Sequence, residues 1–143
     1  MPAPPAKDPA HWLYRFSVEE WLAAADNELR LCAEALGRRA FRPGVTLARR
    51  AAGMAWNAVL IVQPLEIERF GRSYMDHIVA VAGDEAIPDE VRAAAHELRD
   101  TAPASPTLIK LGGPALHMAP LEAATRLVAY ARRRAAQGTL ATS

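Results

Sequence analysis

The chain is poor in cysteine, in net charge and in long apolar runs. Its single cysteine, Cys32, excludes an internal disulfide and is typical of a reducing cytosol. No apolar run approaches the ~20 residues that a bilayer span needs. The opening residues 1–10 show no charged start followed by an apolar stretch, so we expect no signal peptide. The net charge of +1 gives no global basic field for nucleic acid. The sequence therefore predicts a cytoplasmic protein without membrane contact.

The patterns of metal and phosphate sites are also missing. Three of the four histidines have no ligand spacing to one another or to the cysteine: His11, His96 and His117. The carboxylates are scattered, with no Glu-x-x-His pair of the di-iron type. The glycines at 112–113 lack the following helix and lysine of a phosphate-binding loop. We therefore predict no metal and no cofactor.

What the chain does contain is helical periodicity. Its 143 residues suffice for one domain that buries about two-thirds of its unfolded surface. Apolar residues recur at helical spacing over about 18–36, 45–62, 74–82, 89–100 and 121–134. The first segment opens with a Ser17-x-x-Glu20 capping box, with Phe16 and Trp21 at the two staple positions. We predict an all-α, mostly antiparallel up-and-down bundle of four or five helices over residues 17–134. An N-terminal arm (1–16) and a flexible tail (135–143) flank it.

The second predicted helix differs in kind from the first. Its residues 51–62 are apolar on nearly every face, and many of them are small. Such a helix belongs in the centre of a bundle or in a subunit interface, so self-association through it is one prediction. Asn57 is the one polar residue of the run and needs a partner if it is buried. A satisfied core amide is the favoured interpretation, ahead of a functional one.

Three other segments leave alternatives open. Residues 11–16 hold three aromatic side chains, which either pack as a short helical turn or leave an aromatic edge for a partner. Residues 101–119 form a predicted long loop, of a length that is often functional, with a possible short strand at 107–111. Arg126 and the run at 132–134 form a basic helix end, more typical of a solvated C-terminus than of an RNA contact.

Several segments share a pattern with a known family. The first is Trp21-Leu22-x-x-Ala25-x-x-Glu28-Leu29, and the second is the alanine-rich stretch from 48 to 60. The third is the Gly-Arg-Ser-Tyr-Met-Asp segment at 71–76, and residues 123–131 match more loosely. In this order they resemble the HEPN domains (higher eukaryotes and prokaryotes nucleotide-binding).

The resemblance implies a compact bundle that often dimerises and works beside a nucleotidyltransferase partner, in toxin–antitoxin or defence systems. Catalytic members are metal-independent ribonucleases with an Arg-x(4–6)-His motif completed by both subunits of a dimer. Arg72-x4-His77 fits that motif. A neutral imidazole can take the proton of a ribose 2′-OH while a guanidinium holds the phosphorane charge.

The residues around this motif also allow a structural interpretation. With fifteen arginines and four histidines, a chain of this length yields on the order of one such match by chance. Arg72 and Asp76 would form an ordinary ion pair in a continuous helix, in which Arg72 and His77 point about 140° apart. Two hypotheses follow. The first is a HEPN-like binding or accessory module, as a homodimer or as the partner of a nucleotide-handling protein. The alternative is a metal-independent endoribonuclease with Arg72 and His77 as catalytic residues. Burial of His77 would count against the alternative.

Overall fold

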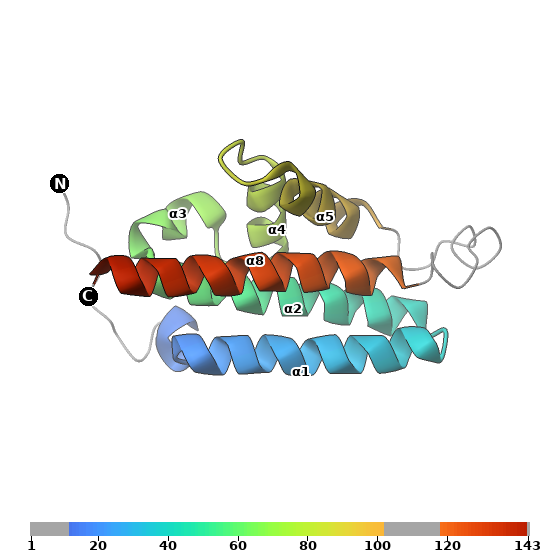
Figure 1. Ribbon diagram of the computed structural model, residues 1–143. Helices are drawn as coiled ribbons and strands as arrows, with labels where there is room; N and C mark the ends of the chain where they lie inside the picture. Colours follow the sequence, from blue (N-terminus) through green and yellow to red (C-terminus); the bar gives the residue numbers. More distant parts are fainter. Residues whose placement is uncertain (1–11, 102–117, 143) are drawn as a thin grey trace.

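Three long helices lie side by side in the computed structural model, which describes residues 12–101 and 118–142 (Figure 1). They are α1 (Val18–Gly37), α2 (Phe41–Val62) and α8 (Ala119–Thr142). α2 lies between the other two and packs most extensively against both. The described residues contain no strand, so the prediction of an all-α bundle is confirmed.

A second layer of shorter helices covers α2 and α8 on one side (Figure 1). The 3-10 turn η2 (Pro64–Glu66) and α3 (Ile67–Phe70) lead out of α2. They are followed by α4 (Tyr74–Ala82), which packs on α2, and α5 (Asp89–Asp100), which packs on α8. Before α1, the 3-10 turn η1 (Trp12–Arg15) lies against α2. This layer brings the start of α4 and the turn η1 to the same helix, α2.

The direction of α8 departs from a simple up-and-down bundle. α1 and α2 are antiparallel, but α8 runs in the same direction as α2 (Figure 1). Near the ends of both helices, a Cβ placed on Gly138 would lie only 2.8 Å from Cγ2 of Val62. The change arises because α3, α4 and α5 return the chain toward the beginning of α2. There the Arg49 guanidinium donates to the Leu98 and Thr101 carbonyls at the end of α5, at 2.8 and 2.7 Å.

The predicted helix boundaries agree with the structure for α1, α4 and α5, but not for α2 and α8. α2 begins at Phe41, within the segment predicted as a turn, because Pro43 in a first helical turn lacks only an N–H that has no partner there. α8 continues to Thr142, beyond the predicted end near Arg134, and Ala135 within it is 1% exposed. The predictions for residues 1–11, for the loop at 102–117 and for a strand at 107–111 lie outside the described residues.

The apolar character of α2 is explained within the chain itself. All ten residues from Ala51 to Leu60 are buried between the neighbouring helices. The small residues permit the close approach: a Cβ placed on Gly53 would lie 2.3 Å from Cβ of Tyr74 on α4. The apolar character of α2 therefore no longer indicates self-association, because residues 51–60 are covered by the chain itself and leave no exposed apolar face. None of the helices in the described ranges combines the length and apolarity that crossing a bilayer requires.

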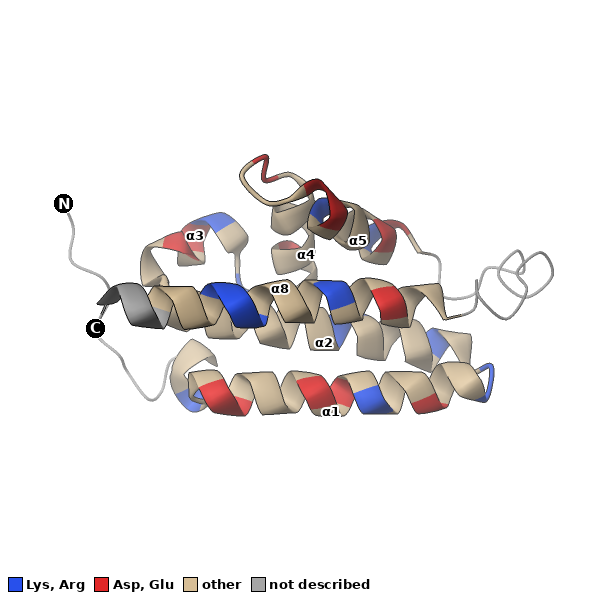
Figure 2. Ribbon diagram, viewed as in Figure 1, with Lys and Arg blue, Asp and Glu red and all other residues tan. Residues whose placement is uncertain are grey.

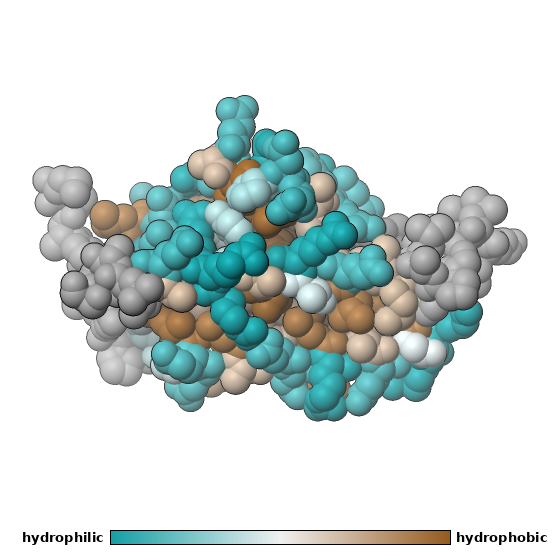
Figure 3. Space-filling view, viewed as in Figure 1, coloured by the Kyte–Doolittle hydropathy of each residue, from teal (hydrophilic) through white to brown (hydrophobic). Residues whose placement is uncertain are grey.

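The surface carries charges of both signs over most helices (Figure 2). The basic run at 132–134 lies inside α8 rather than at a helix end, contrary to the prediction. Arg132 there pairs with Asp26 of α1 at 2.7 Å, and the Arg134 guanidinium lies 5.4 Å from the centre of the Trp56 ring. At least these two basic residues of α8, Arg132 and Arg134, therefore contact other helices of the bundle. Apolar residues also reach the surface along the seam between α8 and α1 (Figure 3).

Candidate functional site

His77, one half of the predicted catalytic pair, lies inside the bundle with an exposed fraction of 0%. Its Nδ1 lies 2.7 Å from the backbone carbonyl of Phe70, which closes α3. Its Nε2 lies 2.7 Å from the side-chain carboxamide of Asn57 on α2. Both ring nitrogens are therefore engaged by the protein. The prediction that Asn57 is a satisfied core amide is confirmed, since Asn57 is 1% exposed and its partner is this imidazole.

The protonation of His77 follows from this environment. Burial lowers the pKa of the His77 imidazole, which favours the neutral ring at physiological pH. A backbone carbonyl can only accept, so the Nδ1–H donates to Phe70 and Nε2 must accept a hydrogen bond. The Asn57 atom that lies 2.7 Å from Nε2 in the structure is Oδ1, which cannot donate. A neutral ring therefore requires the carboxamide to be turned over, so that its NH2 group donates to Nε2 and its carbonyl oxygen points away from the imidazole. The oxygen and nitrogen of a carboxamide are assigned from such networks, and the neutral ring decides the assignment here.

Arg72, the other half of the pair, lies outside α4 in the short turn before it. Ser73 is the N-cap of α4, and Asp76 completes the capping box by accepting from the Ser73 backbone N–H at 3.2 Å. This hydrogen bond is the largest of the contributions that lower the pKa of Asp76. The predicted ion pair between Arg72 and Asp76 is wrong, because Arg72 is not helical and the carboxylate is occupied by the cap. Instead the exposed Arg72 guanidinium lies 5.8 Å from the centre of the Trp12 ring.

Arg72 and His77 thus both contact the Trp12 ring, but they differ in exposure. The Trp12 ring stacks on His77 with 6.2 Å between ring centres, and Arg72 lies over the same side chain. Only Arg72 reaches the surface, because Trp12 of η1, Asn57 and the Phe70 carbonyl enclose the imidazole. No hydrogen bond joins Arg72 to His77 among the described residues.

Next to this arrangement lies a pocket of about 270 Å³, which we name the Trp12 pocket. Its lining comes from η1, α1, α2 and the start of α4: Trp12, Arg15, Trp21, Asn57, Arg72, Ser73 and Tyr74. The indole N–H of Trp21 donates to the Leu13 carbonyl at 2.8 Å and fixes η1 against α1. Tyr74 is held against α2 by its contact with Gly53. Four elements that are distant in the sequence therefore fix the shape of the Trp12 pocket.

The charge in the Trp12 pocket is positive. Arg15 and Arg72 are both exposed, and neither forms an ion pair within residues 12–101 and 118–142. The neighbouring Arg50 is neutralised by Glu28 at 3.2 Å. Burial raises the pKa of the Tyr74 hydroxyl, so this side chain stays uncharged at neutral pH. The polar atom of Asn57 that does not face His77 has no hydrogen-bond partner among the described residues. The pocket thus presents two cationic groups, two indoles and the amide atom of Asn57 that does not face His77.

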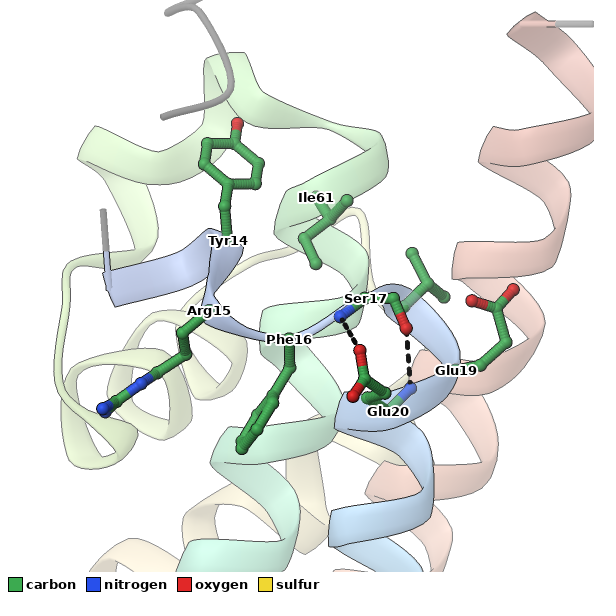
Figure 4. A pocket seen from close by; sticks show the side chains of 8 residues that line it. Tyr14, Arg15, Phe16, Ser17, Glu19, Glu20 and Ile61 are labelled. Carbon is green, nitrogen blue, oxygen red and sulfur yellow. Dashed lines mark hydrogen bonds between the residues drawn. The ribbon is translucent and has the colours of Figure 1, made fainter. Parts of the chain in front are cut away.

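A larger groove of about 520 Å³ lies on the other side of η1, where Ile61 and the start of α1 line it (Figure 4). Its polar groups serve the helix start: the Ser17 hydroxyl accepts from the Glu20 N–H at 3.1 Å, and Glu20 accepts from the Ser17 N–H at 3.0 Å. The side chains of Tyr14 and Arg15 point away from each other in Figure 4. No group of polar atoms converges in this groove, so it is the weaker candidate.

The aromatic segment around η1 mostly packs on the bundle, as its first interpretation predicted. Leu13 has an exposed fraction of 0%, and Phe16 meets Trp21 edge-on at 4.8 Å, which confirms the predicted staple. Phe16 remains 39% exposed. The segment therefore supplies structure on one side and a wall of the Trp12 pocket on the other.

The remaining sequence candidates do not form a site in the described part of the chain. His96 is exposed, and His11 and His117 lie outside the described residues. No group of three or more potential ligands could hold a metal ion within the described ranges. Cys32 is buried with its thiol 3.3 Å from the Gly44 carbonyl, and burial raises the pKa of that thiol to about 11, so it is a poor nucleophile.

Sequence reasoning singled out Arg72 but missed the residues that surround it. Trp12 and Arg15 were noted only within the aromatic segment 11–16, Tyr74 only within the segment 71–76, and Asn57 only as a lone polar residue in an apolar run. No protein-family model, curated protein or solved structure gives a match to this chain. The resemblance to HEPN domains and the catalytic roles of Arg72 and His77 therefore stay predictions.

Proposed function

We propose that this chain is a non-catalytic helical module that acts by binding, and that the Trp12 pocket and the surface around it form its recognition site. The observation that carries the proposal is the engagement of His77. With an exposed fraction of 0% and both nitrogens at 2.7 Å from protein groups, the imidazole serves the core. The exposed Arg15 and Arg72 beside it can bind a ligand instead.

The alternative, an endoribonuclease that uses Arg72 and His77, faces a geometric obstacle. A general base must come within about 3 Å of the proton that it removes. His77 could meet a ribose hydroxyl only if Trp12 moved away and the hydrogen bond to Asn57 broke. Arg72 alone can stabilise phosphorane charge but cannot take the proton. We therefore rank this activity second.

The wider role follows the HEPN resemblance and is part of the proposal. An accessory module of this kind would act as a homodimer or beside a nucleotide-handling partner such as a nucleotidyltransferase. Because α2 is buried in the monomer, a homodimer would need another surface. Light scattering of the purified chain over a concentration series measures its mass, and a mass of one chain throughout would refute the homodimer.

The proposal is tested by RNA cleavage with EDTA present. Wild type is compared with Arg72→Ala, with His77→Gln, and with Arg133→Ala as a matched control, an exposed arginine that lies on α8 and outside the Trp12 pocket. We expect no cleavage by any of the four proteins. Cleavage by wild type and by Arg133→Ala that disappears in the other two variants would refute the non-catalytic proposal and establish the ribonuclease. Circular dichroism of each variant shows that the fold is intact.

A further inference from the structure

The chemistry of the Trp12 pocket allows the class of its ligand to be narrowed, and this step rests on the proposed function. We propose that the pocket binds a compact aromatic anion, whose acid group lies between Arg15 and Arg72 and whose ring lies against the indoles. The ligand is defined by this shared chemistry, an acid joined to one flat ring. A carboxylate and a phosphate both satisfy it.

The positive charge of the pocket favours an anion. Arg15 comes from η1 and Arg72 from the turn before α4, so two guanidinium groups from different segments flank one pocket. Neither has a carboxylate partner among the described residues, and no acidic side chain lines the pocket beside them. The nearby carboxylate of Asp76 is held by the backbone N–H of Ser73. Guanidinium groups bind carboxylates and phosphates in two-pronged geometry, so an unneutralised pair of them points to an anion.

A polar side chain lies at the floor of the pocket. Asn57 is a polar side chain that is 1% exposed, and one of its two amide atoms is fixed by His77. The other atom has no partner in the described residues, although Asn57 lines the pocket. With a neutral imidazole this atom is the carboxamide oxygen, and it is not one of the buried atoms that lack a hydrogen bond in the described part of the chain, so it opens onto the pocket. It can accept a hydrogen bond from a ligand hydroxyl such as that of 4-hydroxyphenylacetate.

The size and the lining of the Trp12 pocket limit the ligand to a small molecule. A volume of about 270 Å³ is just below the usual range of small-molecule sites, which begins at about 300 Å³. The apolar part of the lining consists of the indoles of the half-buried Trp12 and the buried Trp21. This space suits one ring with a short acid arm. The formal net charge of +1 and the interspersed acidic residues do not suit a long polyanion (Figure 2).

The test is a titration of the full-length chain followed through the indole N–H signals of its three tryptophans by NMR. Trp12 and Trp21 line the pocket, whereas Trp56 lies in the core against Phe70 and Tyr130, which makes it an internal control. Trp12→Phe and Trp56→Phe variants together assign the three signals. The probes are 4-hydroxyphenylacetate and phenyl phosphate, with 2-phenylethanol as the neutral counterpart and acetate as the anion without a ring.

We expect both aromatic anions to shift the signals of Trp12 and Trp21 but not that of Trp56, and the tighter of the two identifies the acid as a carboxylate or a phosphate. Arg72→Gln and Arg15→Gln should each weaken binding about tenfold, since each removes a charge-assisted contact. Arg133→Gln, an exposed arginine outside the pocket, should leave binding unchanged.

Four results would overturn the inference. They are no shift with millimolar probe, equal binding of 2-phenylethanol, full binding by the Arg72→Gln variant, or a short single-stranded RNA that shifts the two signals more strongly than any small anion. The two experiments distinguish failure of the aromatic-anion proposal from failure of the proposed binding function. RNA cleavage refutes the non-catalytic module, whereas a silent titration without cleavage refutes only the aromatic anion.

Discussion

The hydrogen bond between Asn57 and His77 makes a quantitative prediction about stability. Replacing Asn57 by Ala leaves the Nε2 acceptor of a fully buried imidazole without a partner. An unsatisfied buried group costs about 1–3 kcal/mol, so we expect Asn57→Ala to lower the free energy of unfolding by about 2 kcal/mol. That is a large share of the about 5–15 kcal/mol by which most domains are stable. Urea unfolding followed by circular dichroism measures it.

The matched variant is His77→Gln, which removes the titrating ring but keeps one amide donor for the Phe70 carbonyl and one acceptor for Asn57. A double-mutant cycle with Asn57→Ala then isolates the coupling between the two side chains. Contacting residues in one hydrogen-bond network couple by about 0.5–3 kcal/mol. A cost of Asn57→Ala below about 0.5 kcal/mol, within the range of neutral surface substitutions, would refute the bond between Asn57 and His77.

The same pair predicts the pH dependence of folding. Burial lowers the pKa of His77 in the folded state, so the unfolded chain binds a proton more readily. The contribution of His77 to stability is therefore fully present above its unfolded pKa of about 6.5, and it is lost progressively as the pH falls below that value. His77→Gln should flatten this dependence between about pH 5 and pH 7 relative to wild type. A slope that is identical in both proteins would mean that the folded imidazole titrates like an exposed one.

Three further substitutions or modifications test the packing. Gly53→Ala should destabilise the fold by about 1–3 kcal/mol, because the new Cβ would lie 2.3 Å from Cβ of Tyr74. Thermal unfolding should show a lower Tm, and an unchanged Tm would contradict this contact. Gly71→Ala should cost about 1–3 kcal/mol as well, since Gly71 has φ +74° and ψ −165°, a region that is essentially restricted to glycine, and its Cβ would lie 2.6 Å from Cβ of Asp76. A Tm equal to that of wild type would contradict this backbone conformation. The Cys32 thiol should react with Ellman's reagent only after urea is added, because burial raises its pKa to about 11, and rapid labelling of the native chain would contradict its burial.

Local signals in the sequence were sufficient for most of the helices. The capping box of Ser17 and Glu20, the cap at Ser73 and the stop at Gly83 each act within one turn of backbone, so residues close in sequence decide them. The start of α2 was missed because Pro43 suits a turn and a first helical turn equally well. The length of α8 was missed because contacts such as that of Gly138 with Val62, rather than local propensity, hold its last turns.

The candidate site also combines features that the local sequence decides with features that tertiary contacts decide. The sequence placed Arg72 and His77 five residues apart and treated them as one catalytic pair. In the structure the turn at Gly71 and the cap at Ser73 separate them, so that one side chain is exposed and the other is enclosed. No periodicity could indicate that η1 would cover His77 or that Arg15 would come to lie beside the same pocket as Arg72.

By itself, the sequence determined the all-α class, the positions of most helices and the apolar character of α2, because these follow from apolar periodicity and local caps. It left open whether α2 lies in the centre of a bundle or in a subunit interface. The tertiary structure alone decided the parallel direction of α8, the partner of Asn57 and the composition of the Trp12 pocket. Those features depend on contacts between residues far apart in the chain, such as Trp12 with His77 and Asn57 with His77. Side chains that carry no local pattern acquire a function only where packing brings them together.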